Sequence, residues 1–387
     1  MMEGILKYYD SYRPPHPNGT IVDVEFHVQQ ISSITEATRE MEIETFYSQI
    51  WHDPRLAFTS YETCKRNITL DNDMLAKLWT PEICVMNSRV AKAHASPGAN
   101  TFLIVYQDGK VWLNYRMQIR IPCHMELVRF PLDRMICELQ LESMIYGQQD
   151  IALQWLKEAP ITMTGPVELP DFTFAGWTVY NETSDRPIGP WTMLTAQFHF
   201  RRKYGFYLMQ CYVPSAVTVL VTWVSFMLEP KAISARITLD VSAFMALSFQ
   251  FGQTTTHLPR TNAVKCIDLW MIGCIFFIFM SLVQLTLINV IAKRQKQSLS
   301  KLRQLIMTKN KMLDEQRRRK QQRHKDIFKW LGLPKAHASP SDIDMISVHL
   351  FPAAFISFTL CYWLYFLFFD SSKFHDGYRS NIVPNYN

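Results

Sequence analysis

Four long uncharged apolar stretches in the second half of the chain constrain its fold more than any other feature. They are Phe206–Leu228, Val241–Thr256, Leu269–Ala292 and Leu350–Phe369. Three of them reach the roughly 20 residues that a helix needs to cross a hydrocarbon core. Charged residues make up only 19% of the chain, below the roughly 25% of soluble domains. These features exclude a disordered chain, a collagen and a small disulfide-stapled protein, and they argue against a soluble enzyme.

Basic residues gather between the third and fourth apolar stretches. From Lys293 to Lys335, 15 Lys and Arg residues oppose three acidic ones, a net charge of +12, whereas the whole chain carries +6. Basic loops beside membrane spans stay in the cytoplasm, so 293–345 is predicted to be cytoplasmic. An ordinary linker is favoured over a nucleic-acid or an acidic-lipid surface. Counting spans from this loop places residues 1–205 and the C-terminus outside the cell.

The predicted organisation is that of a multi-pass plasma-membrane protein. Its parts are an outer domain at 1–205, the first three spans at 206–228, 235–256 and 267–292 within 206–292, a cytoplasmic loop at 293–345, a fourth span at 346–370 and an outer tail at 371–387. Glycosylation sequons at Asn18, Asn67 and Asn181 agree with this orientation. Met1–Asp10 has no apolar signal region, so we expect a trimmed or incomplete N-terminus.

The outer domain has the pattern of β-structure. Five segments alternate apolar and polar residues, namely Thr20–Gln30, Thr101–Gln107, Lys110–Ile121, Met135–Leu141 and Thr192–Arg202. Gln107-Asp108-Gly109 is a hairpin signal, and Met2–Tyr12 is the helix candidate of this region. Short strands with proline-rich joints over about 200 residues predict an all-β, immunoglobulin-like sandwich.

Cysteine placement indicates an oxidising outer side. Cys123 and Cys137 enclose 13 residues, and closing such a loop would remove unfolded-state entropy worth roughly 3 kcal/mol. Cys64 and Cys84 form either a second disulfide or two free thiols, and the sequence leaves both options open. No zinc-like spacing and no HExxH, GxSxG or GxxxxGK[ST] motif occurs. We therefore expect no metal site, no cofactor and no enzymatic activity.

The second span carries a polar stripe. Thr238, Ser242, Met245, Phe249, Gly252 with Gln253, and Thr256 recur at steps of three and four residues, so they share one helical face. A polar seam between packed helices is one interpretation. The stripe runs the full length of the helix, however, with Arg236 at its foot and His257 at its top. Because polar faces inside a membrane mark ion pathways, we favour a pore lined by a ring of copies.

A series of short motifs follows one order along almost the whole chain. They are Ile5-Leu6, Tyr9-Asp10 and Arg13-Pro14; Trp51 and Asp53-Pro54-Arg55-Leu56; Leu78-Trp79-Thr80-Pro81-Glu82; Phe130-Pro131-Leu132-Asp133 between Cys123 and Cys137; Arg202 and Gly205-Phe206-Tyr207; Tyr212-Val213-Pro214-Ser215; Ser234-Ala235-Arg236; and Lys265 with Ile267-Asp268-Leu269-Trp270. From about Ile5 to Asp370 the chain resembles a subunit of the Cys-loop pentameric ligand-gated ion channels, nearest the γ-aminobutyric-acid and glycine receptor branch. The resemblance implies an outer β-sandwich with an N-terminal helix, a four-helix transmembrane bundle, and a homo- or hetero-pentamer.

The resemblance implies that a small, neurotransmitter-like extracellular ligand binds between subunits. One face of the site would draw on Val85, Met144, Ile145, Tyr146 and Trp191. The opposing face would draw on Phe46, Ser48, Trp112, Asn114 and Arg116. Aromatic rings attract cationic amines, and arginine forks onto a carboxylate. Each of these residues also fits ordinary strand packing.

Several positions depart from the pattern of the transmitter receptors. Met144 and Ile145 stand where an aromatic residue is usual, and Ser48 stands where amino-acid receptors often have arginine, although Arg116 is kept. The range 182–198 contains no adjacent cysteine pair, which argues against a nicotinic-type acetylcholine subunit. The sequence therefore does not name the ligand.

The resemblance also implies residues that couple ligand binding to the pore. Asp133 and Arg202 match a pair that the family places at the junction of its two domains, and loss of one partner would strand a charge. Pro259 and Arg260 begin the joint between the second and third spans, where the outer domain would push. The alternative for Asp133 and Arg202 is that they are ordinary surface charges.

Residues at the start of the second span predict the selectivity. Cation-selective relatives place Glu just before the Arg that opens this span, and Ala235 stands there before Arg236. Five partially positive helix N-termini would also converge at this mouth, which favours chloride. Asp240 opposes this, although we expect it off the lining face and paired with Arg236. Met245 holds the usual gate position, and Phe249 above it could narrow the pore and gate by dewetting.

Three functions stay open at this point. The first is a ligand-gated chloride channel, in which small anions cross a lipid membrane at a location that includes synapses. The second is a cation-conducting member, with Asp240 as the residue responsible. The third is a non-conducting accessory subunit of the same assembly, which the atypical ligand-site and gate residues would fit. No nucleic-acid partner is expected.

Overall fold

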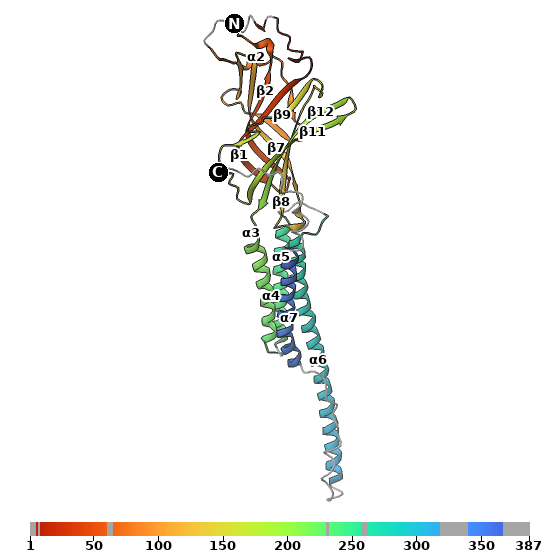
Figure 1. Ribbon diagram of the computed structural model, residues 1–387. Coiled ribbons are helices and arrows are strands. Elements are labelled where there is room, and N and C mark those ends of the chain that lie inside the picture. The colour runs from red at the N-terminus through yellow and green to blue at the C-terminus, as the bar shows by residue number, and fades with distance from the viewer. Residues whose placement is uncertain are drawn as a thin grey trace. The chain divides into compact units, whose positions relative to one another are not determined.

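The computed structural model describes residues 5–6, 8–59, 65–229, 232–256, 262–317 and 340–366. The chain divides into two compact units, the first extending to Tyr204 and the second containing the helices from Gly205 to Thr256 and from Cys266 onward. Figure 1 shows the strands of the first unit and the helices of the second. Each unit has its own apolar core.

The described part of the first unit is a β-sandwich of twelve strands. They are β1 Thr20–Thr35, β2 Glu40–His52, β3 Asn67–Leu70, β4 Ile83–Val85, β5 Val90–Ala93, β6 Thr101–Tyr106, β7 Lys110–Met125, β8 Arg134–Ser143, β9 Ile151–Trp155, β10 Ile161–Met163, β11 Phe172–Arg186 and β12 Gly189–Arg202. Short helical turns are η1 Pro54–Leu56, α2 Asn72–Leu75 and η2 Leu127–Arg129. The predicted β-sandwich fold is confirmed.

The strands form one sheet that folds over on itself. Its order is β10-β1-β2-β7-β8-β12-β11, with β3, β4, β5, β6 and β9 paired to its sides. Most neighbours are antiparallel, whereas β9 and β10 run parallel to β1. The core lies where alternate side chains of the two halves meet. It contains Val24, Phe26, Met41, Ile43, Leu113, Ile119, Leu139, Leu141, Leu194, Phe198 and Phe200.

The predicted hairpin at Gln107-Asp108-Gly109 joins β6 to β7. Gly109 has a φ of +89°, and a Cβ added there would lie 2.5 Å from the backbone oxygen of Asp53. Glycine is therefore required at this position both by conformation and by space. The turn holds β7 in register, which matters because β7 carries three of the candidate ligand-site residues.

The five predicted strands correspond to β1, β6, β7, β8 and β12, with ends shifted by a few residues. The sequence did not predict the other seven described strands, β2, β3, β4, β5, β9, β10 and β11, of which β2 and β11 are the longest. In β2, Met41, Ile43 and Tyr47 are buried on one face while acidic residues occupy the other, and in β11 a register shift beside Gly176 interrupts the alternation. Of the predicted helix Met2–Tyr12, Ile5 and Leu6 are helical, whereas the described residues 8–12 are not helical, so the prediction is wrong for that end.

The described part of the second unit is helical. It contains α3 Gly205–Tyr207, a π-helical turn η3 Leu208–Tyr212, α4 Val213–Met227, α5 Ile233–Thr256, α6 Cys266–Arg317 and α7 Pro340–Leu364. Gly205–Met227, Cys266–Met307 and Ile343–Leu364 are long and apolar enough to cross a membrane. The 24 residues of α5 span about 36 Å at 1.5 Å per residue, but their polar stripe makes α5 less apolar. Residues 367–370 of the predicted fourth span lie outside the described residues.

Hydrogen bonds between buried side chains connect these helices. The Tyr212 and Tyr362 hydroxyls lie 2.7 Å apart, and the Tyr362 hydroxyl donates to the Cys266 carbonyl at 3.0 Å. Trp270 Nε1 donates to Ser215 Oγ at 2.9 Å. Polar groups inside a bilayer need such internal partners, so these bonds favour one packing of α4, α6 and α7.

The third helix is longer than the sequence predicted. A change from apolar to basic residues placed its end at Ala292, whereas α6 continues to Arg317. No glycine or proline interrupts 293–317, and Lys, Arg, Gln and Leu are good helix formers. The basic segment 293–317 is therefore a continuation of the third helix.

Candidate functional site

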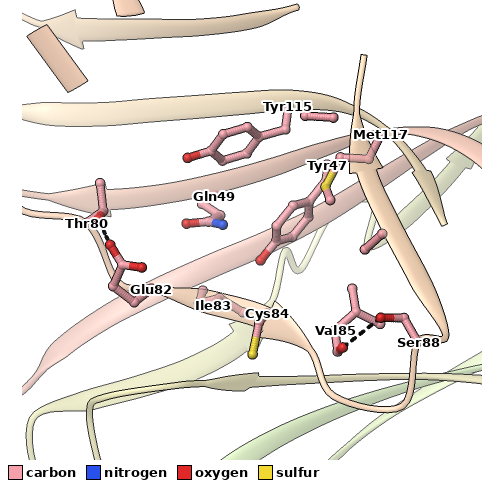
Figure 2. A pocket seen from close by; sticks show the side chains of 12 residues that line it. Tyr47, Gln49, Thr80, Glu82, Ile83, Cys84, Val85, Ser88, Tyr115 and Met117 are labelled. Atoms are coloured by element: carbon pink, nitrogen blue, oxygen red, sulfur yellow. Dashed lines mark hydrogen bonds between the residues drawn. The ribbon is translucent and has the colours of Figure 1, made fainter. Parts of the chain in front are cut away.

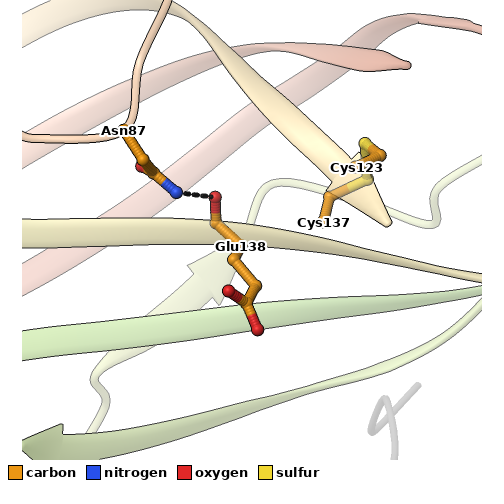
Figure 3. Close-up of a disulfide and its surroundings, with 4 residues drawn as sticks. All are labelled: Asn87, Cys123, Cys137 and Glu138. Carbon is orange, nitrogen blue, oxygen red and sulfur yellow. Dashed lines mark hydrogen bonds between the residues drawn. A yellow bond between two sulfur atoms is a disulfide. The ribbon is translucent and has the colours of Figure 1, made fainter. Parts of the chain in front are cut away.

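The Cys123–Cys137 disulfide closes a loop between β7 and β8. The two sulfur atoms are bonded, and the residues are direct partners in the β7–β8 register. Beside it, Asn87 Nδ2 donates to the Glu138 carbonyl at 2.8 Å (Figure 3). Asn87 Oδ1 accepts from the Gln140 amide. Of the second possible pair, Cys84 carries a free thiol, and Cys64 lies outside the described residues.

Asp133, in the loop that this disulfide closes, pairs with Arg202 at the end of β12. Arg202 Nε donates to Asp133 Oδ1 at 2.6 Å and Nη2 donates to Oδ2 at 3.0 Å, with both side chains 0% exposed. Glu36 accepts a further hydrogen bond from Nη1. The guanidinium lies between the rings of Phe130 and Phe172, 4.7 Å from each centroid. The pair is buried, and the surface-charge alternative is therefore wrong.

The electrostatics of this cluster keep Arg202 charged. Burial opposes the charged guanidinium, but hydrogen bonds and charges from Asp133 and Glu36 outweigh it and raise the pKa of Arg202. A bidentate pair with a third acceptor satisfies most of the guanidinium donors. The loop closed by the disulfide is therefore fastened to the last strand of the sandwich.

Five predicted ligand-site residues gather on one face of β2 and β7. Arg116 lies opposite Phe46, and Asn114 lies opposite Ser48. Asn114 Nδ2 donates to Ser48 Oγ at 2.7 Å, and the ring of Trp112 packs edge-on against another aromatic ring at 5.4 Å. We call this set, Phe46, Ser48, Trp112, Asn114 and Arg116, the β2–β7 face.

Two groups of this face lack hydrogen-bond partners, and its arginine is already engaged. Asn114 Oδ1 and Trp112 Nε1 are buried without a partner. Arg116 Nε donates to Gln29 Oε1 at 2.9 Å, and its guanidinium is 3.7 Å from Glu44 Oε2. The β2–β7 face therefore holds one unpaired donor and one unpaired acceptor, both buried, while Arg116 is held by its own sheet.

The other predicted residues lie around the ends of β4, β8 and the β11–β12 hairpin. Met144 and Ile145 are each 64% exposed, whereas Trp191 is buried. The Tyr146 hydroxyl accepts a hydrogen bond from Trp79 Nε1 at 3.0 Å. Tyr146 is thus held by the domain core, and Trp191 is a buried aromatic residue beside it.

Two charged residues that sequence reasoning missed complete this second cluster. Arg186, the last residue of β11, donates to Glu142 Oε2 at 2.7 Å and places its guanidinium carbon 5.2 Å from the centroid of the Trp191 ring. The Glu142 side chain is 3% exposed, and its Oε1 has no partner. We call Glu142, Arg186 and Trp191 the hairpin cluster. Strand alternation could have placed Glu142 beside Met144, but nothing in the sequence pairs it with Arg186.

Cys84 on β4 also belongs beside this cluster. Cys84 is the register partner of Glu142, and its Sγ lies 3.6 Å from the Glu142 carbonyl and 4.0 Å from Met144 Sδ. Burial raises the pKa of the Cys84 thiol, the Glu142 charge adds to this, and the Arg186 charge opposes it. The predicted residue Val85 is its neighbour on the strand.

A pocket of about 520 Å³, open to solvent at Glu82, Ala91 and Ala93, lies next to the candidate site (Figure 2). Its lining residues are Tyr47, Gln49, Thr80, Glu82, Ile83, Cys84, Val85, Ser88, Ala91, Ala93, Tyr115 and Met117. Burial, with the nearby charge of Glu82, raises the pKa of Tyr115 to about 12. Burial likewise raises the pKa of Tyr47. Both phenols therefore stay neutral at physiological pH and keep their hydroxyl protons.

The polar stripe of α5 is exposed in the chain. Met245 is 64% exposed and Phe249 69% exposed. Thr238, Ser242, Gly252, Gln253 and Thr256 are exposed as well. The residues of α5 that are buried are Arg236, Asp240, Ala243 and Leu247. The packed and exposed faces of α5 are therefore separated as the stripe predicted, and the three hydroxyls of the stripe donate to carbonyls of their own helix.

The charges at the foot of α5 do not lie where the sequence placed them. Arg236 is 1% exposed and donates to both oxygens of Asp344 on α7, at 3.1 and 3.0 Å, and also to the Leu228 carbonyl. Asp240 accepts a hydrogen bond from Ser281 on α6 at 2.9 Å. The prediction that Asp240 pairs with Arg236 is therefore wrong, because each side chain is hydrogen-bonded to a residue of another helix. Ala235 stays exposed.

The remaining predicted residues are exposed or fall outside the description. Asn18, Asn67 and Asn181 are exposed, as glycosylation requires, and their modification stays a prediction. Pro259 and Arg260, the predicted coupling residues between the second and third spans, lie outside the described residues, as does His257.

Comparisons with known proteins identify the family. The model of the neurotransmitter-gated ion-channel ligand binding domain matches residues 1–204, and that of the neurotransmitter-gated ion-channel transmembrane region matches residues 211–335. The chain belongs to this family of neurotransmitter-gated ion channels. The resemblance drawn from the sequence motifs is thereby confirmed, and the family consists of membrane-spanning channels rather than enzymes.

Several relatives in Caenorhabditis elegans are similar to this family member. Ligand-gated ion channel 50 is 43% identical over 288 residues, which cover 74% of this chain and 58% of the relative. The serotonin-gated chloride channel mod-1 is 38% identical over 328 residues, covering 85% and 64%. The acetylcholine-gated chloride channel subunit acc-2 is 33% identical over 367 residues, covering 93% and 82%. The chain thus spans less than two thirds of the length of the first two relatives.

Proposed function

We propose that this chain is a subunit of a pentameric, ligand-gated chloride channel of the plasma membrane. Residues 1–205 and 371–387 lie outside the cell in this proposal, 293–345 lie in the cytoplasm, and synapses are among the locations. The family membership and the two relatives whose names include a chloride channel support it. Homomeric and heteromeric pentamers are both compatible with it.

The exposed stripe of α5 is the observation that carries the channel function. The helix buries one face against its own bundle and leaves the face with Thr238, Ser242, Met245 and Phe249 uncovered by the described chain. Hydroxyl groups gain little by facing lipid. A ring of five copies places these faces around water, with Met245 and Phe249 as the apolar constriction.

Chloride selectivity rests on the inner end of α5. The buried Arg236–Asp344 pair removes this arginine from the pore surface. What remains there is the exposed, uncharged Ala235 and the partial positive charge of each helix N-terminus. Asp240 is buried against α6. The pore mouth thus carries no acidic ring from α5, and this arrangement favours anions.

The ligand site of this proposal lies between neighbouring copies. The hairpin cluster of one subunit and the β2–β7 face of the next form its two walls, because each wall has unpaired polar groups and an aromatic ring of its own. A buried carboxylate beside an indole is suited to an organic ammonium group. Small cationic neurotransmitters are therefore the ligand class. Asp133 and Arg202 pass the motion of the hairpin strand toward the disulfide loop.

Recording of ligand-evoked current tests this proposal. The chain is expressed in oocytes behind a secretion signal and exposed to serotonin, acetylcholine, protons and zinc. We expect current from a cationic amine, with a reversal potential that moves by about 59 mV for a tenfold change of external chloride. Reversal that follows sodium would identify the cation-conducting alternative. If the chain gives no current when expressed alone but alters the current of a co-expressed relative, it is an accessory subunit.

A further inference from the structure

Arg186 occupies the place in the hairpin cluster that suits a cationic ligand. Its guanidinium donates to Glu142 at 2.7 Å and lies over the Trp191 ring at 5.2 Å. The acceptor is almost completely buried, with its side chain 3% exposed, while the arginine side chain is 30% exposed. A carboxylate and an indole face are the two groups that hold an organic ammonium, and here both contact a cation of the protein itself.

The β11–β12 hairpin does not depend on this ion pair for its shape. Backbone pairing runs from Phe172 with Arg202 to Arg186 with Gly189, next to the turn. Gly189 has a φ of +132°, which suits a tight turn and which other residues rarely adopt. The Arg186 side chain therefore reaches back from a hairpin that is already defined by its own backbone.

Only one oxygen of the Glu142 carboxylate has a hydrogen-bond partner. Oε2 accepts from Arg186, whereas Oε1 is buried without a partner. An unpaired buried acceptor costs free energy, and a buried carboxylate that loses its cation costs more. The hairpin cluster therefore favours a bound cation. The Arg186 guanidinium is that cation when no ligand is present.

We propose that Arg186 is a built-in competitor, a tethered cation that an incoming ammonium ligand displaces from Glu142 and Trp191. This inference rests on the proposed function in that it uses the same ligand site. It adds a residue that sets the sensitivity of the receptor to its ligand. It also links occupancy to the hairpin, because ligand binding releases the tip residue of β11 from the interior cluster.

Agonist sensitivity of two arginine variants tests the competition. R186Q removes the charge, and R186K keeps it. R89Q is the matched control because Arg89 forms an ion pair with Glu40 on an exposed part of the sheet. We expect R186Q to lower the half-maximal concentration of a cationic agonist by about tenfold or more, since a charged hydrogen bond no longer competes. R186K and R89Q should stay near the unmodified channel.

Two other results would overturn the proposal. An unchanged half-maximal concentration in R186Q would make the ion pair purely structural. A raised one would mean that Arg186 binds an anionic group of the ligand instead. In the background of E142Q, the effect of R186Q should disappear, because the group for which ligand and arginine compete is gone.

Labelling of Cys84 provides a readout that does not need an open channel. The Cys84 thiol is 3.6 Å from the Glu142 carbonyl. We expect the rate ratio of the cationic reagent aminoethyl methanethiosulfonate to its neutral methyl analogue to rise in R186Q and not in R186K. Taking the ratio cancels changes in the thiolate fraction. Tetramethylammonium should protect Cys84 more strongly in R186Q, with C84S as the control for other thiols.

The two readouts separate failure of this inference from failure of the proposed function. A receptor that gives no current, yet shows the raised labelling ratio and stronger protection in R186Q, would refute the channel proposal and keep the competitor. A receptor that conducts chloride normally, with identical ligand sensitivity and labelling ratio in R186Q, would refute the competitor and keep the channel.

Discussion

Asp133 and Arg202 show how one buried ion pair can hold a loop to a strand. Both side chains are 0% exposed, so removing the carboxylate leaves a buried guanidinium without its bidentate partner. We expect D133N to lower the free energy of unfolding by about 3 kcal/mol. Thermal or denaturant unfolding of the purified receptor measures this change.

The exposed residue Asp171 offers a matched control for this prediction. D171N should change stability by less than about 0.5 kcal/mol, as surface substitutions usually do. Equal effects of D133N and D171N would contradict the importance of the buried pair.

His199 makes the stability of the outer domain depend on pH. Its side chain is buried on β12, Nε2 is 3.1 Å from Thr178 Oγ1, and burial lowers its pKa. The unfolded chain therefore takes up a proton near pH 6.5, where the folded chain does not. Stability should fall as pH drops below about 6.5, by at most about 1.4 kcal/mol per pH unit.

H199Q should remove this part of the pH dependence, whereas H124Q, at an exposed histidine, should keep it. Melting temperatures of the unmodified protein, H199Q and H124Q at pH 7.5 and pH 5.5 test this prediction. An identical loss of stability in H199Q and the unmodified protein would show that another group is responsible.

Single residues were predictable from sequence only where a motif or a strand pattern defined their surroundings. The Cys123–Cys137 loop carries its own motif, and the Asp133–Arg202 pair was implied by the resemblance to the family. The pairing of Arg186 with Glu142 depends instead on how far a hairpin folds back over a neighbouring strand. No motif of the sequence links Arg186 to Glu142, which lies 44 residues before it.

Secondary-structure elements were predictable where alternation was regular. β11 has a register shift that interrupts its alternation, whereas β2 alternates buried and outward residues regularly and was nevertheless not predicted. The end of α6 could not be located from polarity, because a change of solvent along a helix does not break it. Charge partners within the bundle depended on packing, as the Arg236–Asp344 pair between α5 and α7 shows.

The inner ends of α5 and α7 should depend on one another. Arg236 donates to both oxygens of Asp344 in a buried place, so D344N leaves a charged guanidinium without its acidic partner. We expect D344N to reduce the amount of receptor at the cell surface severalfold, since breaking a buried pair costs about 3–5 kcal/mol. Surface biotinylation measures the effect.

The reciprocal exchange supplies the control for this pair. The double variant R236D with D344R should recover part of the surface expression, because it restores opposite charges across the two helices. No recovery, combined with normal expression of D344N alone, would contradict a structural role for the pair.

The whole molecule is incomplete as a single chain. Its two candidate ligand walls, the β2–β7 face and the hairpin cluster, form on different parts of one sandwich, and the polar stripe of α5 has no covering element within the described residues. Both features are explained at once by a ring of copies, in which each wall meets its complement and the stripes surround water. Both features therefore agree with the proposed pentamer, in which this chain is one of five subunits.

Cysteine substitution along α5 tests the water-filled path most directly. The stripe positions Thr238, Ser242 and Met245 are compared with the packed positions Ala243 and Leu247. A water-soluble methanethiosulfonate reagent, applied with agonist present, should modify cysteines at the stripe positions and change the current, and should leave the packed positions unmodified. Uniform protection of the stripe, or reaction confined to the packed positions, would contradict a channel lined by α5.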